Sequence, residues 1–302
     1  MALGTNHVTN TTGAVFIPEI WSDEIIAAYK QNLVMANLVS KMSFKGKKGD
    51  TLHIPKPTRG VAAAKAASTQ VTLQAATETE VQVLVNKHYE YSRLIEDITE
   101  VQALASMRKF YTSDAGYALS KQVDTHLLQL GRNVNGGAGV IAYEKAVIAS
   151  DGATLYTGSN EAAITDAGIR AVIQKLDDAD VPMDGRSLVL PPVARNTMMG
   201  LARFTEQAFV GEVGGGNTIR NGKIGDVYGV GVYVTTNCET ATGAARIGMM
   251  FHKDAFVLAE QMGVRSQTQY KQEYLGTLFT SDMLYGTAEL RDEAAVAIAL
   301  AA

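Results

Sequence analysis

The chain has 302 residues and a formal net charge of −4, and charged residues make up 19% of it, against about 25% in average soluble domains. Hydrophobic residues reach 46%, which excludes an intrinsically disordered chain, and the weak negative charge excludes a basic protein that grips nucleic-acid phosphates over a broad face. The single cysteine, Cys238, excludes a disulfide framework and a multi-cysteine zinc site. The start of the chain lacks the pattern of a signal peptide, and the most apolar stretch, residues 294–302, is too short to span a membrane, so we expect a soluble protein.

The N-terminal region predicts an arm followed by a helix. Residues 1–12 are polar, rich in Thr and Asn, and without periodicity, which indicates an extended arm. From Pro18 to Ala36, apolar residues recur at spacings of three and four, as in an amphipathic helix. This helix is expected to end before the basic, glycine-containing run 45–49.

Two predicted strands flank a long stretch of small residues. The first, residues 50–57, ends in prolines, and the second, about residues 81–91, alternates apolar and polar side chains. Between them, residues 58–77 are weakly hydrophobic and contain seven alanines. Connections this long are uncommon within a compact domain and are usually functional. We therefore predict an extended hairpin that binds a partner. The alternative is a flexible surface hairpin that binds nothing.

One very long helix is predicted next. Apolar residues from Ile98 to Leu130 fall on one stripe, so the segment from about Asp97 to Arg132 would be a single helix roughly 54 Å long, with Gly116 permitting a bend. Residues 133–164, rich in Gly, Ala, Ser and Thr, read as a connecting region.

A second, compact unit is predicted from Thr165, which should cap a helix. It continues with a buried strand at 187–190, a helix from Pro191 to about Phe204, a mobile loop at 212–221, and strands at 227–235, 246–251 and 255–260. The tail from Gly263 is strand-like twice, in 266–287 and in 288–300. Helices and strands do not alternate regularly, so the predicted fold class is α+β.

No motif for catalysis, cofactor binding or metal binding is complete. The glycine–lysine pairs at 46–47 and 222–223 lack the rest of a P-loop, and Gly229-Val-Gly231 lacks the third glycine of a dinucleotide fingerprint. The acidic residues near the end of the helix from Thr165 match a calcium loop only loosely, because Pro182 stands where a ligand is needed; they are Asp177, Asp178, Asp180 and Asp184. We predict no catalytic, cofactor or metal site, no cofactor, and no enzyme activity.

The histidines and the cysteine give no site either. The five histidines show no metal-ligand spacing; they are His7, His53, His88, His126 and His252. His53 and His88 could face each other across the hairpin as a cross-strand polar pair. Cys238 with a distant His252 is weak support for a nucleophile, and a buried hydrophobic cysteine is the commoner outcome.

The order of these parts resembles the major capsid proteins of tailed bacteriophages, the Hong Kong 97-type coat fold, over nearly the whole chain. The local sequences that add to the resemblance are Phe16-Ile-Pro-Glu-Ile-Trp-Ser-Asp-Glu24, Lys223-Ile-Gly-Asp-Val-Tyr-Gly-Val-Gly-Val232, Phe251-His-Lys-Asp-Ala-Phe256 and Ala288-Glu-Leu-Arg-Asp-Glu-Ala-Ala-Val296. The resemblance implies a fold with an N-terminal arm, an extended hairpin loop, a long spine helix, and peripheral and axial domains. None of these sequences is catalytic.

The resemblance also implies roles and boundaries. Residues 1–49 would form the arm and first helix, 50–92 the extended loop lying across an adjacent subunit, and 93–164 the peripheral domain with its spine helix. Residues 165–260 would form the axial domain around five- and six-fold axes, and 261–302 the closing strands of the peripheral domain. Some relatives cross-link their shells through a loop lysine; Lys65 lies in the predicted tip, but no asparagine partner is evident.

The function implied is a coat protein that assembles into hexamers and pentamers of an icosahedral phage head around double-stranded DNA, in a virion assembled in the bacterial cytoplasm. Expected partners are further copies of the chain, a separate scaffolding protein, a portal, a decoration protein, and DNA held without sequence-specific contacts; no membrane is expected. A bacterial encapsulin-type nanocompartment shell and an uncharacterised cytosolic enzyme are the alternatives. The charge deficit fits subunit contacts, since neutral residues collect in the arm, the hairpin tip and the glycine loops.

Overall fold

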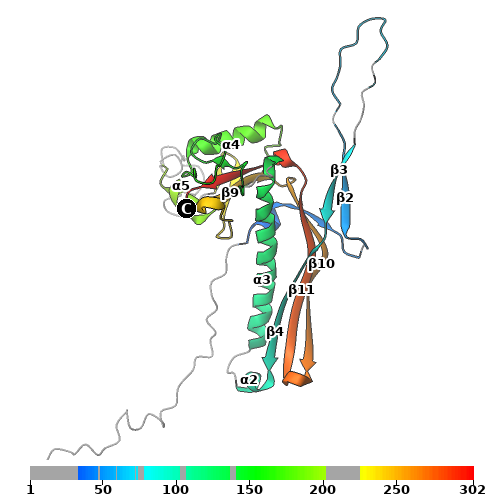
Figure 1. Cartoon of the computed structure of the whole chain (residues 1–302), viewed down its shortest axis with the longest axis vertical. Helices are drawn as coiled ribbons and strands as arrows, with labels where there is room; N and C mark the ends of the chain where they lie inside the picture. The colour runs from blue at the N-terminus through cyan, green and yellow to red at the C-terminus, as the bar shows by residue number, and fades with distance from the viewer. Residues whose placement is uncertain are drawn as a thin grey trace, which may run out of the picture.

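The computed structural model describes residues 33–46, 48–58, 60–71, 73, 78–102, 107–136, 141–201 and 225–302. These residues form a four-stranded sheet, a six-stranded sheet and a separate two-stranded hairpin. The long helix α3 (Met107–Gln129) runs alongside the four-stranded sheet, and the hairpin projects away from the rest of the molecule (Figure 1). The predicted arm, most of the first helix, and the predicted loop at 212–221 lie outside the described residues.

The four-stranded sheet is long and narrow, with the order β1-β10-β11-β4. Its strands are β1 (Ser40–Ser43), β10 (Phe256–Lys271), β11 (Gly276–Glu289) and β4 (Lys87–Glu96). β1 is parallel to β10, and the other pairs are antiparallel. A 3-10 turn, η5 (Gln272–Tyr274), joins β10 to β11, and Leu275 follows it with a left-handed φ of 43°.

Helix α3 packs on one face of this sheet through small and aliphatic side chains. Its buried residues include Ala115, Leu119, Val123 and Leu127, which lie at helical spacing on one side. The prediction of one continuous helix over 97–132 is wrong: α2 (Asp97–Gln102) and α3 are separate, and a 3-10 turn, η2 (Leu130–Arg132), ends the segment. Figure 1 shows α2 lying across the foot of α3, and Ile98 is 63% exposed there, so it does not extend the buried stripe.

The six-stranded sheet has the order β5-β12-β9-β6-β8-β7. Its strands are β5 (Val147–Ile148), β12 (Ala295–Leu300), β9 (Arg246–His252), β6 (Arg186–Leu190), β8 (Val230–Val234) and β7 (Asp226–Val227). Every residue of β6 and β12 is buried, as expected for strands covered on both faces.

Among the described residues, two helices belong to the six-stranded unit, α4 (Asp166–Asp178) and α5 (Pro192–Met199). Thr165 caps α4 as predicted, because its Oγ1 accepts a hydrogen bond from the Gly168 amide at 3.1 Å. Glycine is required at position 168, where a Cβ atom would lie 1.6 Å from the Ala149 carbonyl oxygen.

The two sheets share one core and are joined by crossing segments. Residues 253–255 link β9 to β10, and the turn η6 (Asp292–Ala294) links β11 to β12. One buried cluster takes side chains from α1 (Met35–Leu38), α3, and both sheets; it includes Met35, Leu127, Val189, Phe251, Phe256 and Tyr285. The remaining 3-10 turns are η3 (Val134–Gly136) and η4 (Thr242–Ala244).

The structure corrects three predicted strands. The strand predicted at 81–91 is two strands, because the chain leaves β3 (Thr79–Leu84) at Val85 and enters the four-stranded sheet as β4. The first tail strand, 266–287, is the hairpin of β10 and β11. The last strand, expected to close the peripheral domain, is β12 and pairs with β9 inside the six-stranded sheet. β5 likewise pairs with β12, although a connecting region was expected there.

Candidate assembly surfaces

The projecting hairpin has two paired strands at its base, and the described residues of its tip belong to neither strand. β2 (Thr51–Lys56) runs antiparallel to β3, with Thr51 opposite Leu84 and Lys56 opposite Thr79. The described residues of the tip are exposed, and three are large and apolar: Val61 is 76% exposed, Val71 64% and Leu73 91%. Isolated exposed apolar residues are common, but a projecting tip whose described residues carry three of them is a candidate interaction surface.

The root of the hairpin is firmly attached to the long sheet. Val83 and Val85 are buried against Val257 and Ala259 of β10, and the Val85 amide donates to the Asp50 carbonyl at 2.7 Å. β11 carries Gly286 at this crossing, where a Cβ atom would lie 2.4 Å from the Leu84 carbonyl oxygen. Glycine therefore allows the hairpin backbone to approach β11 closely.

The predicted pairing of His53 with His88 is wrong. His53 lies opposite Gln82 in the hairpin, and its Nδ1 is 3.0 Å from Glu80 Oε2. The side-chain hydrogen bonds from Gln82 and His53 lower the pKa of the exposed Glu80 carboxyl. His88 belongs to β4, because the chain changes sheets between Leu84 and Lys87.

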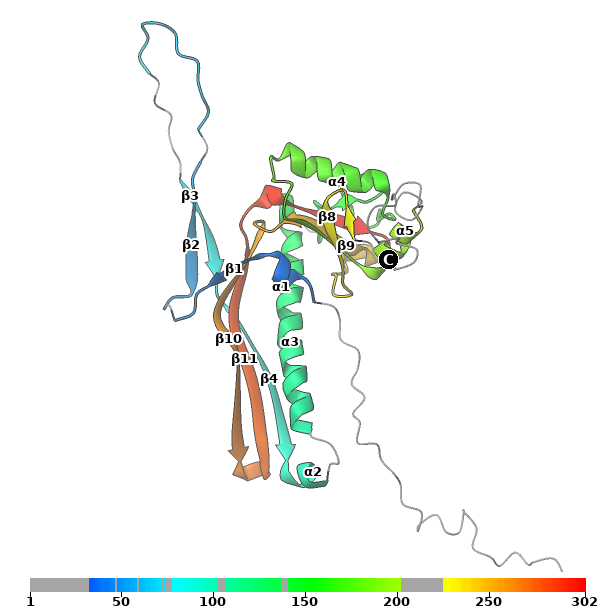
Figure 2. The same ribbon diagram turned by 180° about the vertical axis from the view of Figure 1, so that it is seen from behind.

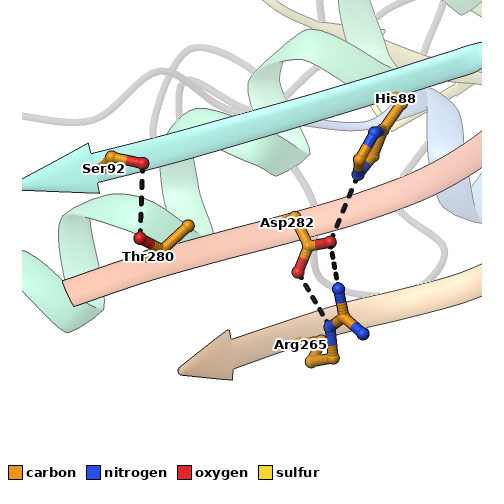
Figure 3. Close-up of polar contacts among 5 residues, drawn as sticks. All are labelled: His88, Ser92, Arg265, Thr280 and Asp282. Atoms are coloured by element: carbon orange, nitrogen blue, oxygen red, sulfur yellow. Dashed lines mark hydrogen bonds and ion pairs between the residues drawn. The ribbon is translucent and has the colours of Figure 1, made fainter. Parts of the chain in front are cut away.

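His88 instead contacts a carboxylate on the face of the long sheet that is opposite α3. Arg265 of β10 donates from Nε and Nη2 to the two oxygens of Asp282 at 3.0 and 2.7 Å, and His88 Nε2 lies 3.2 Å from Asp282 Oδ2. Figure 3 shows this row running across three strands, with the Ser92–Thr280 hydroxyl contact beside it. The Arg265 hydrogen bonds are the main cause that lowers the Asp282 pKa, so the row carries an ion pair rather than a titrating acid.

On the other face, His126 connects α3 to the sheet. Its Nδ1 lies 2.7 Å from the Tyr285 hydroxyl, and its Nε2 lies 3.2 Å from the Tyr89 hydroxyl. Burial, with the positive charge of Lys87, lowers the His126 pKa to about 4. The imidazole is therefore neutral at physiological pH and acts as a hydrogen-bonding group of the core.

Asp124 fixes the point where the N-terminal region enters the body. Its Oδ1 accepts the amides of Val34 and Met35 at 3.1 and 2.8 Å, and its Oδ2 accepts Asn237 Nδ2 at 3.1 Å. The side chain is buried, and this burial raises the carboxyl pKa against the lowering effect of the three hydrogen bonds. One carboxylate on α3 thus holds both the start of α1 and the loop that follows β8.

The remaining candidate residues do not come together as a site. Asp177 accepts a hydrogen bond from the buried Arg186 at 2.7 Å, so it anchors a turn. Cys238 is buried in the shared core, and this burial raises its thiol pKa to about 12, unlike a reactive thiol. Across the described ranges, no three His, Cys, Asp or Glu side chains are grouped as a metal ion would need. His7 lies outside those ranges, and Gly229 and Gly231 flank the start of β8.

Comparisons with known sequences and structures identify a family for the chain. A family model described as phage capsid protein matches residues 19–301. No curated protein matches the chain. No helix among the described residues is both long and apolar enough to cross a membrane.

Several solved structures share the fold over nearly their whole length. A chain of Mycobacterium phage Che8 is 23% identical, with a TM-score of 0.74, and the match covers 94% of this chain and 97% of that chain. The capsid structure of the Cyanophage P-SCSP1u gives 16% identity and a TM-score of 0.75, covering 99% and 97%. The mature capsid of bacteriophage PhiM1 gives 14% and 0.69, covering 94% and 92%.

These matches confirm the expected Hong Kong 97-type coat fold and its α+β class. The family model covers far more than half of the sequence, and the matching structures include capsids of several phages. The chain belongs to the phage capsid protein family and is a major capsid protein of the virion shell.

Proposed function

We propose that copies of this capsid protein form hexamers and pentamers, and that each copy lays its β2–β3 hairpin across the adjacent subunit of the same capsomer. The observation that carries this proposal is the hairpin itself, with a buried root and an exposed apolar tip (Figures 1 and 2). A tip that cannot bury its apolar side chains on its own subunit gains stability when a neighbour covers them. Folding of the hairpin region is thereby linked to assembly.

The two sheets suit different positions in such a shell. We assign the four-stranded sheet with α3 to the peripheral domain, and the six-stranded sheet with α4 and α5 to the axial domain at the five- and six-fold axes. Head-to-tail contacts between copies close into rings by rotation, as hexamers and pentamers require. Residues 1–19 would reach neighbouring subunits, and they lie outside the described part of the chain.

Other partners belong to the same proposal. A net charge of −4 avoids strong attraction to phosphates, which suits a container that packs double-stranded DNA without binding its sequence. A separate scaffolding protein, a portal and a decoration protein are the expected helpers. The matched family is that of phage capsids, which favours a phage head over a nanocompartment that encloses enzymes.

Deletion of the tip from Val61 to Ala76 tests the hairpin role. The deletion leaves the paired base and the buried root intact, so the subunit should fold, and electron microscopy should find no shells. A finer variant changes Val61, Val71 and Leu73 to Asn, with Met183→Asn as the control, because Met183 is 73% exposed on the other unit. Shells formed by the tip variants would show that the hairpin role is wrong.

The assembly proposal as a whole is tested by expressing the chain alone and with its neighbouring genes. Shells, sheets or tubes in electron micrographs are the expected products. A small globular species under every condition would overturn assembly into hexamers and pentamers.

A further inference from the structure

The outer edge of β10 has a stretch that no other described strand covers. β1 pairs only with Val257–Glu260, and side chains close the next positions: Lys45 contacts Glu260 at 3.3 Å, and Gln261 donates to the Gly49 carbonyl at 3.0 Å. From Arg265 to Lys271, the pairing of β10 is with β11 alone among the described residues. Figures 1 and 2 both show this edge on the side of the sheet away from α3.

This edge lacks most features that prevent strand pairing. Residues 264–270 are all exposed, and they include no proline and no acidic side chain. The charge of Arg265 is compensated by the paired hydrogen bonds to Asp282 (Figure 3). Two large apolar side chains stand at its ends, with Val264 52% and Tyr270 48% exposed. An edge of this kind is a template for an added strand.

We propose that residues 264–270 pair antiparallel with the same residues of a second copy, across a two-fold axis at Gln267, so that two long sheets join into one. The inference rests on the proposed function, since a closed shell of this chain supplies the second copy. Hydrogen-bonded strands must run side by side, and a two-fold rotation normal to the sheet places two identical strands antiparallel. Rotations of higher order normal to the sheet would leave them crossing.

The side chains select Gln267 as the centre. There Val264 lies opposite Tyr270 of the second copy, Ser266 lies opposite Thr268, and Arg265 lies opposite the neutral Gln269. A centre at Thr268 would place Arg265 opposite Lys271, and like charges directly opposite are destabilising. A centre at Ser266 would place Tyr270 opposite Met262 and so extend the pairing across the whole register shift between Met262 and Arg265, whereas a centre at Gln267 reaches only Val264 within that shift.

A cysteine at the axis tests the register. In Gln267→Cys shells, the two introduced thiols would be directly opposite, with Cα atoms about 5 Å apart, within the range of a disulfide. Gln269→Cys is the matched control, because its copies would be separated by about 13 Å along the strands. The native Cys238 adds little background, since it is buried. After mild oxidation we expect about tenfold more disulfide-linked dimers from Gln267→Cys shells than from the control.

A charge pair tests the same contact without a cross-link. Positions 264 and 270 are about 20 Å apart within one strand, so they do not interact in a single subunit. The variant Val264→Glu/Tyr270→Lys would place opposite charges across the axis twice, whereas Val264→Lys/Tyr270→Lys would place like charges there. Both lose the Tyr270 hydroxyl contact to Asp97, so they differ only at position 264. The Glu/Lys variant should yield several-fold more shells at low salt, and the difference should shrink at high salt.

The outcomes separate this inference from the proposed function. Shells in which Gln267→Cys links no better than Gln269→Cys would overturn the two-fold strand pairing and leave assembly itself intact. The same result is expected if residues 1–32, rather than a second β10, occupy the edge. Equal shell yields from the two charge variants would also overturn the pairing. Absence of shells from the unmodified chain would contradict the proposed function instead.

Discussion

The Nδ1 atom of His126 lies 2.7 Å from the hydroxyl oxygen of Tyr285, and this contact joins the last turn of α3 to β11. Its Nε2 also meets Tyr89 of β4, so one imidazole touches two strands. Burial and the charge of Lys87 lower the pKa of His126 from 6.5 to about 4, so protonation of its imidazole destabilises the folded subunit.

The first prediction concerns acid stability. The unfolded chain binds a proton at His126 more readily than the folded chain, so the contribution of this residue is fully present above pH 6.5 and is lost as the pH falls through about 4. His126→Gln, which does not titrate, should lose less free energy of unfolding over this interval than the unmodified subunit. Urea unfolding at a series of pH values measures it, and parallel curves would contradict it. Tyr285→Phe is the control, because it removes one contact, worth about 1 kcal/mol, but leaves the titrating ring.

The second prediction concerns Glu289, at the end of β11, and here the free energy of unfolding should fall rather than rise as the pH increases. Its Oε1 is buried and has no hydrogen-bond partner among the described residues, and burial together with the Asp292 carboxylate raises its pKa from 4.5 to about 7. The stability linked to this proton is fully present below pH 4.5 and is lost as the pH rises through about 7. Glu289→Gln should therefore flatten the decline in unfolding free energy over this interval. The control variant Glu293→Gln should leave this decline unchanged. Equal effects of Glu289→Gln and Glu293→Gln would show that Glu289 is not the titrating group.

The third prediction compares two glycines. Gly286→Ala should destabilise the subunit by about 1–3 kcal/mol, because the new Cβ would lie 2.4 Å from a backbone oxygen at the hairpin root. Gly116→Ala, in the interior of α3 with no atom within 4 Å of the new Cβ, should stabilise it by about 0.5–1 kcal/mol. Thermal unfolding of both variants measures the difference, and shifts of the same sign would refute the packing at Gly286.

The fourth prediction concerns Asp124. Asp124→Ala leaves two buried backbone amides and the Asn237 side chain without their acceptor, so a loss of about 3 kcal/mol of stability is expected. Asp151→Ala is matched, since Asp151 also accepts two backbone amides, at 2.9 and 3.0 Å, but Asp151 is exposed, so this variant should lose much less stability than Asp124→Ala. Equal losses in denaturant unfolding would mean that burial at Asp124 contributes little.

Local patterns predicted the elements whose signals are local. Local signals of this kind are the cap at Thr165 with its helix, the buried strand at 187–190, and the two hairpin strands predicted at 50–57 and from about 81. The break at Val85 was not predictable in this way, because β3 and β4 continue the same alternation while pairing with different sheets. A period of two reports which face is buried and carries no information on which strand lies beside it.

The side-chain contacts of the two histidines and of Asp124 were not predicted, because their partners lie far away along the chain. His53 and His88 were expected to meet, yet each found a carboxylate on another strand, Glu80 and Asp282. Asp124 gave no sequence signal, since its partners Val34, Met35 and Asn237 lie about 90 or more positions away along the chain. The long alanine-rich hairpin was predictable because its lack of local packing is itself a local property.

The position of β12 has a consequence for synthesis. Its six residues are fully buried between β5 and β9 in the six-stranded sheet. A ribosome-bound chain cannot complete this sheet until β12 has been translated and has left the exit tunnel. A chain that terminates before β12 lacks this buried strand, so we expect that it cannot present a complete six-stranded sheet to a growing lattice.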